Sequence, residues 1–131
     1  MEKILIKVPV VVKAKLTEKL KEKMLDEYTK VAEQMDLELK QINIDRQREL
    51  DAHPEQSEQI ARFFGNEIVK RQQRRAEALD RKEHTQKLSI GAEIIQGTLE
   101  RQVELKVGDD FREVMNSEIL IEDDKVVAIR G

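Results

Sequence analysis

The stretch that decides the fold is residues 17–52, which read TEKLKEKMLDEYTKVAEQMDLELKQINIDRQRELDA. It contains no glycine or proline, and its apolar residues are separated by four, four and three positions in turn. This eleven-residue repeat corresponds to three helical turns and predicts a nearly straight or slightly right-handed seam. Thr17 is a good N-cap, and Glu18 in the first turn favours the positive end of the helix dipole. We therefore predict one helix over 17–52, roughly 50 Å long at about 1.5 Å per residue. Its seam positions are Leu20, Met24, Tyr28, Val31, Met35, Leu39, Ile42, Arg46 and Leu50.

A second helix is predicted after the break Asp51-Ala-His-Pro-Glu55, because Pro54 suits a first helical position. This helix is expected to end near Leu88, with Gly91 as the stop. The two helices are nearly equal in length and the break is short, so they are expected to fold back on each other as an antiparallel coiled-coil hairpin over 17–90. The seam positions of the second helix are expected at Ile60, Phe64, Ile68, Arg71, Arg75 and Leu79.

The two ends of the chain have the alternating pattern of β-strands. Residues 3–16, KILIKVPVVVKAKL, place apolar side chains at every even position and all of their lysines at odd positions. Strand character resumes at Glu93, with Gly97 as a bulge, and continues after a short helix at 111–115. The predicted fold is α+β, one domain over 1–131. The hairpin is inserted between strands of a small antiparallel β-sheet or open barrel, formed by residues 3–16 and 93–130.

The composition argues against several classes of function. The chain of 131 residues has a net charge of −3, so its charge steers it toward no particular partner. It has no cysteine, which weakly favours a reducing compartment, and no apolar run approaches the roughly 18 residues of a membrane span. We therefore expect a cytoplasmic protein without a membrane partner.

Catalytic and metal-binding patterns are not found in the sequence. The two histidines, His53 and His84, have no metal-ligand spacing to a second histidine or to a cysteine. No serine or threonine lies in a nucleophile elbow, and the five glycines are scattered singly. We expect a non-enzymatic protein with no catalytic residues, no metal and no cofactor.

The predicted turn between the helices is crowded with polar residues. The acidic residues there are Asp45, Glu49, Asp51, Glu55 and Glu58, with His53 between them. Asp51, His53 and Glu55 are the candidate residues of the tip, and two interpretations remain open. In one, an acidic hairpin tip acts on a polymerase and positions a metal ion. In the other, the carboxylates solubilise the turn and complement the helix dipoles.

A basic stretch begins at Lys70 and includes Arg71, Arg74 and Arg75. It is a candidate RNA-binding stripe. If the turn is at residues 52–53, residue i of the first helix faces about 107 − i of the second. The three arginines would then lie near Asp36, Glu33 and Val31, so that cross-helix ion pairs explain two of them without RNA.

Two adjacent phenylalanines, Phe63 and Phe64, lie near the start of the second helix. Neighbours on a helix cannot both point into a two-stranded seam, so one of them is expected to be partly exposed. This side chain either covers the turn or contacts a protein partner, which includes a second copy of the chain.

The sequence resembles the YlqD family of small bacterial proteins over nearly its whole length, through its long charged hairpin and most clearly at its two ends. The resemblance rests on the opening VPVVVKAKLTEKLKEKM and on the tail GAEI…VELKVGDDF…SEILIEDDKVVAIR. It implies a cytosolic bacterial protein and brings no catalytic residues; gene neighbourhoods of some relatives hint at a ribosomal setting. The function predicted is a protein–protein interaction module with the hairpin as its contact arm. The alternatives are an RNA- or ribosome-associated factor and a polymerase factor acting through the tip.

Overall fold

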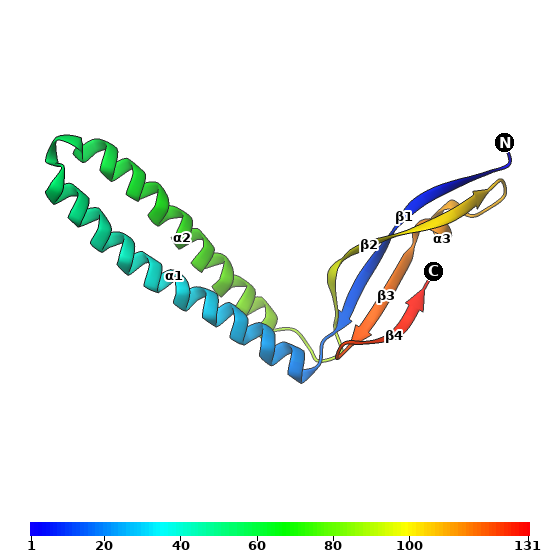
Figure 1. Cartoon of the computed structure of the whole chain (residues 1–131). Coiled ribbons are helices and arrows are strands. Elements are labelled where there is room, and N and C mark those ends of the chain that lie inside the picture. Colours follow the sequence, from blue (N-terminus) through cyan, green and yellow to red (C-terminus); the bar gives the residue numbers. More distant parts are fainter. The chain divides into compact units, whose positions relative to one another are not determined.

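The computed structural model describes all residues, Met1–Gly131, and shows an α+β chain with the helices between terminal strands (Figure 1). The chain divides into two compact units. We call Glu22–Lys87 the hairpin unit, and Met1–Lys21 together with Leu88–Gly131 the β unit. The α+β class predicted from the sequence is confirmed. None of the helices combines the length and the apolar character needed to cross a membrane.

The first long helix, α1, runs from Glu18 to Ala52 without interruption. Thr17 caps it, since the Thr17 hydroxyl accepts a hydrogen bond of 3.1 Å from the backbone N–H of Leu20. A short 3-10 turn, η1 (Pro54–Gln56), follows and has proline at its start. The second long helix, α2, runs from Ser57 to Gln86. The predictions of one helix over 17–52 and of a break at Pro54 are confirmed.

The seam of the hairpin follows the predicted positions on α1, all of which are buried or half-buried. On α2 the prediction holds as far as Arg75 and is then wrong. Leu79 is 36% exposed, whereas its neighbour Ala78 is only 5% exposed and occupies the seam. The seam continues through Lys82 to the buried Thr85. The seam residues that follow Arg75 are three, four and three positions apart, and this spacing keeps them on the side of α2 that faces α1. The predicted spacing had two steps of four in succession, which would turn the seam residues away from α1.

Two ion pairs between α1 and α2 fix the register of the hairpin. Arg75 pairs with Asp36 at 2.8 Å, and Arg71 pairs with Glu38 at 3.6 Å. Residues at the same level therefore have numbers that sum to about 110, not to the 107 expected from the sequence. The physical reason is η1, which lengthens the turn and moves its midpoint toward Glu55. The predicted proximity of Arg71 to Asp36 is replaced by the pair between Arg75 and Asp36.

The β unit contains four strands and one short helix. The elements are β1 (Lys3–Lys15), β2 (Glu93–Lys106), α3 (Phe111–Met115), β3 (Ser117–Glu122) and β4 (Lys125–Arg130). The strand order is β2-β1-β3-β4, with β1 parallel to β3 and antiparallel to β2. The sheet is therefore mixed and open, so that the predicted antiparallel sheet or barrel is wrong. The end of β2 lies beside the beginning of β1, where Lys106 pairs with Lys3. The chain therefore enters β3 from that end of the sheet, and β3 runs in the same direction as β1.

The register divides the sheet into two chemically different faces, because directly paired residues point to the same side. A bulge between Val12 and Lys13, next to Gly97, confirms the predicted irregularity. It shifts the alternation of β2 by one residue, so that Ile94 lies on the same side of the sheet as Leu99 and Ile95 lies on the other side. We call the side that contains Val8 and Val10 the apolar face, and the other side the charged face. The apolar face contains Ile4, Ile6, Val8, Val10, Val12 and Ala14 of β1, Ile94, Leu99, Arg101, Val103 and Leu105 of β2, Ser117, Ile119 and Ile121 of β3, and Val126 and Ile129 of β4.

A network of ion pairs covers the charged face. Arg130 of β4 bridges Glu118 of β3, at 2.8 Å, and Glu93 of β2, at 2.7 Å. Lys13 of β1 lies 2.7 Å from the same Glu118. The hydrogen bond from Arg130 lowers the pKa of both carboxyl groups, and Lys13 lowers that of Glu118 further. This face is adapted to water, and the network links all four strands.

Candidate interaction groove at the distal end of the hairpin

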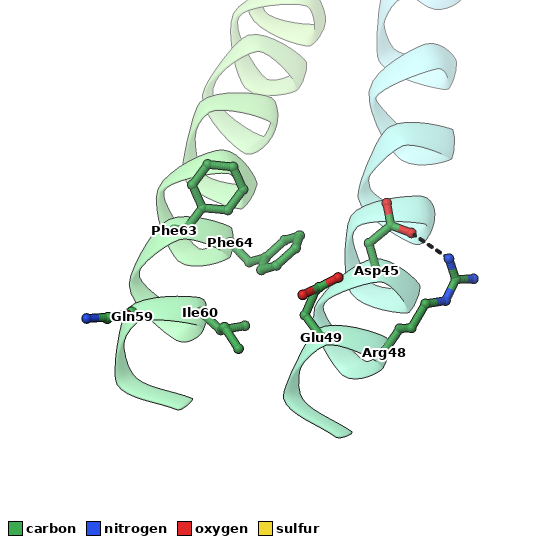
Figure 2. Close-up of a pocket in the computed structure, with 7 residues that line it drawn as sticks. All are labelled: Asp45, Arg48, Glu49, Gln59, Ile60, Phe63 and Phe64. Atoms are coloured by element: carbon green, nitrogen blue, oxygen red, sulfur yellow. Dashed lines mark ion pairs between the residues drawn. The ribbon is translucent and has the colours of Figure 1, made fainter. Parts of the chain in front are cut away.

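A groove lies between α1 and α2 near the turn that joins them (Figure 2). Its volume is about 540 Å³, and side chains of both helices line it. We call it the distal groove. The lining residues are Asp45, Arg48 and Glu49 of α1 and Gln59, Ile60, Phe63 and Phe64 of α2.

The α2 side of the distal groove is apolar. Ile60 is buried, and Figure 2 shows that Ile60 and Phe64 point toward α1. Phe63 is 59% exposed, which confirms that only one of the two adjacent phenylalanines packs into the seam. Its ring meets that of Phe64 edge to face, with the centroids 5.1 Å apart. The exposed ring is therefore held in one orientation by a half-buried neighbour.

The α1 side of the groove is acidic. Asp45 and Glu49 are one helical turn apart, so both carboxylates lie on the same stripe of α1. Asp45 accepts a hydrogen bond of 2.9 Å from Gln41 and lies 3.9 Å from Arg48. The Glu49 carboxylate forms no ion pair within the chain. An aromatic ring and an unneutralised carboxylate thus face the same open space from opposite helices.

Of the three tip residues proposed from the sequence, His53 and Glu55 lie together and Asp51 lies apart from them. Asp51 accepts a hydrogen bond of 3.0 Å from Gln47, one turn earlier on α1. His53 Nδ1 lies 3.5 Å from a Glu55 carboxylate oxygen, and all three tip residues are exposed. No group of three histidine, aspartate or glutamate side chains is close enough together to hold a metal ion. The three side chains lie on the surface of the turn, outside the distal groove.

The arginines of the basic stretch differ from one another. Arg71 is half-buried between Glu67 of its own helix and Glu38 of α1, and its hydrogen bond is the main cause of the lowered pKa of Glu67. Arg75 is held by Asp36. Arg74 is exposed and forms no ion pair. Two of the three guanidinium groups are thus engaged by carboxylates. The expected pairing of Arg74 with Glu33 is wrong, because the shifted register gives the cross-helix carboxylate to Arg75 instead.

Phe63 and Phe64 were identified from the sequence, whereas Asp45 and Glu49 were assigned to an acidic tip and were not connected with the two phenylalanines. With the register of the structure, Asp45 is at the level of Phe64, and Glu49 is at the level of Ile60. The signal that points to them is the acidic pair at a spacing of four residues beside the seam. Finding its partners on α2 required the correct turn length, which the sequence did not show.

Comparisons with known proteins agree with this fold. A crystal structure of a protein of unknown function from Synechococcus sp. WH 8102 superposes with a TM-score of 0.85 at 24% sequence identity. The match covers 98% of this chain and 97% of that one, and it shows the fold alone. No curated protein matches the chain significantly. The family model described as YlqD protein matches residues 4–130, nearly the whole sequence. The chain therefore belongs to the YlqD family.

Proposed function

We propose that this protein acts by binding another protein, without catalysis, and that the distal groove is its contact site. The observation that carries the proposal is the exposed Phe63 ring opposite the unpaired Glu49 carboxylate. Exposed aromatic side chains in a defined orientation are the usual anchors of protein interfaces. The residues that line the groove include no pair of nucleophile and base, so their chemistry favours recognition over reaction.

The chemistry of the groove specifies what it would accept. A segment that enters between two helices is most simply a third helix, which lays its apolar side chains on Ile60, Phe63 and Phe64. The carboxylates of Asp45 and Glu49 favour a lysine or arginine on the flank of that helix. We therefore assign the groove to an amphipathic helical segment of a protein partner, with a basic residue beside its apolar stripe.

Selection from a library of displayed helical peptides on the full-length protein tests this assignment. We expect the enriched peptides to combine apolar residues three and four positions apart with lysine or arginine. Binding of such a peptide should shift the backbone NMR signals of residues 45–64. It should weaken at least tenfold in a Phe63→Ala variant, and it should weaken with salt in the wild type more than in a Glu49→Gln variant.

Val69→Ala is the matched control, because Val69 is an exposed apolar residue of α2 that does not line the groove. This variant should bind the selected peptide as the wild type does. Peptides that lack basic residues, or signal shifts confined to the β unit, would contradict the proposal. Equal loss of binding in Val69→Ala and Phe63→Ala would contradict it as well.

A further inference from the structure

A second recess lies beside the seam, nearer the middle of the hairpin, and we call it the middle recess. It has a volume of about 120 Å³ and is lined by Met35, Glu38, Lys70, Arg71 and Arg74. Lys70 and Arg74 follow Phe63 of the distal groove by seven and eleven positions, or about two and three turns, so the three residues share one stripe of α2. Glu38 precedes Asp45 by seven positions on α1. The two recesses therefore lie in line on one flank of the hairpin.

The unpaired charge of the middle recess is opposite in sign to that of the distal groove. Lys70 and Arg71 are both engaged by Glu67 of their own helix. Arg74 is exposed and forms no ion pair, so its guanidinium group is not neutralised within the chain. In the distal groove the group without an ion pair is the Glu49 carboxylate. The flank thus presents a free negative group near the turn and a free positive group toward the middle of the hairpin.

We propose that the helix bound in the distal groove continues along this flank and places an acidic residue on Arg74. This inference rests on the proposed function, since it requires a helical partner at Phe63. The distance along α2 from Phe63 to Arg74 is about 16 Å, which a partner helix lying along the hairpin spans with about eleven of its own residues. The partner segment therefore has a basic residue near one end of its apolar stripe and an aspartate or glutamate about three turns away.

The residues of this flank favour a protein helix over a nucleic acid. A stripe that binds nucleic acid neutralises phosphates with several free basic groups and stacks bases on aromatic rings. Here Glu38 lines the middle recess beside Arg74. The Phe63 ring shares the distal groove with two carboxylates, which repel phosphate. A helix with charges of opposite sign at the two recesses is also held in one direction along the hairpin, because the reversed direction would bring like charges together.

Charge reversal on both sides of the contact tests the proposal. The probe is the tightest binder to the full-length protein from a library of helical peptides of about 25 residues, long enough to reach both recesses. We expect this peptide to carry an aspartate or glutamate about three turns from its basic residue. Arg74→Glu should weaken binding about tenfold, and a peptide with lysine in place of that acidic residue should bind the variant as the original peptide binds the wild type.

Arg62→Glu is the matched control, because Arg62 is an exposed arginine of α2 without an ion pair. It lies two positions after the buried Ile60, on the side of the helix turned away from α1, so its reversal should not weaken binding.

Three variants separate this inference from the proposed function. Loss of binding in Phe63→Ala without loss in Arg74→Glu would overturn the contact at Arg74 and leave the proposed function intact. Loss in neither variant would overturn both. A loss in Arg74→Glu that the lysine peptide does not restore, or that Arg62→Glu reproduces, would overturn the contact as well. Binding of a single-stranded RNA oligonucleotide that is lost in Arg74→Glu would assign Arg74 to a nucleic acid and overturn it equally.

Discussion

Arg75 Nε lies 2.8 Å from Asp36 Oδ1, and this ion pair joins α2 to α1 across the hairpin seam. With the pair between Arg71 and Glu38 it fixes which residues of the two helices lie at the same level. In this register the buried residues Ala32 and Ala78 lie at the same level of the two helices. The same register places Asp45 and Glu49 opposite the aromatic end of α2, so the distal groove depends on it.

The coupling between Arg75 and Asp36 is expected to be small and specific. Both side chains are about half exposed, so a double-mutant cycle with Arg75→Ala and Asp36→Ala should give about 0.2–1 kcal/mol in urea unfolding. A matched cycle with Arg74→Ala in place of Arg75→Ala should give no coupling, because Arg74 forms no ion pair. A larger coupling for Arg74 than for Arg75 would show that the register is wrong.

The position of the seam on α2 is tested by two neighbouring residues. Ala78→Glu places a carboxylate where the seam is closed and should lower the free energy of unfolding by several kcal/mol. Leu79→Glu adds the same charge one position further, where the side chain is 36% exposed, and should lower the free energy of unfolding by less, about 1 kcal/mol. Thermal and urea unfolding measure both. A larger loss of stability for Leu79→Glu than for Ala78→Glu would mean that Leu79, and not Ala78, lies in the seam.

The core of the β unit is expected to depend on Leu16, which is fully buried and directly follows β1. Leu16→Ala should cost about 2–5 kcal/mol, from lost burial and from the cavity left behind. Leu5→Ala removes the same atoms from a residue of β1 that is 64% exposed on the charged face, and it should cost much less. Urea unfolding of the two variants provides the comparison. Equal losses would mean that the buried side of β1 has been misassigned.

The ion-pair network of the charged face predicts how stability depends on pH. Arg130 holds the pKa of Glu93 and Glu118 below their ordinary value of 4.5 in the folded protein. Their contribution is therefore present above pH 4.5 and is lost as the pH falls through the lowered pKa values. Arg130→Gln should lose less stability than the wild type when the pH is lowered through this range. Arg112→Gln is the control, since the Arg112 guanidinium forms no ion pair, and it should follow the wild type.

The sequence was sufficient for the elements and insufficient for their pairing. The uninterrupted spacing from Leu20 to Leu50 specified α1, and the alternation around Val8 and Val10 specified β1, because both depend on local periodicity. The register of the hairpin depended on η1, whose length the sequence does not display. Leu79 was misplaced because the seam residue after Arg75 can lie three or four positions further along the helix. The sequence offers an alanine at the first of these positions and the more apolar leucine at the second.

The sheet and the candidate sites show the same limit. The direction of β3 relative to β1 follows from where β2 ends, which is a property of the assembled chain. Phe63 was found because two adjacent phenylalanines cannot share one seam. Asp45 and Glu49 stood in the sequence as part of an acidic tip, and only the register separates them from Asp51 and Glu55. The Ser117 hydroxyl, which is buried without a hydrogen-bond partner, gives no signal in the sequence.

The measurement that tests the central claim most directly is photo-crosslinking in cells from a photoreactive residue placed at Phe63. We expect one discrete protein adduct, whose crosslinked peptide is an amphipathic helix with a basic residue, and which is lost when Glu49→Lys is added. The same residue placed at Val69 should give no such adduct. Adducts that are identical from both positions, or that persist with Glu49→Lys, would contradict the claim that the distal groove is the contact site.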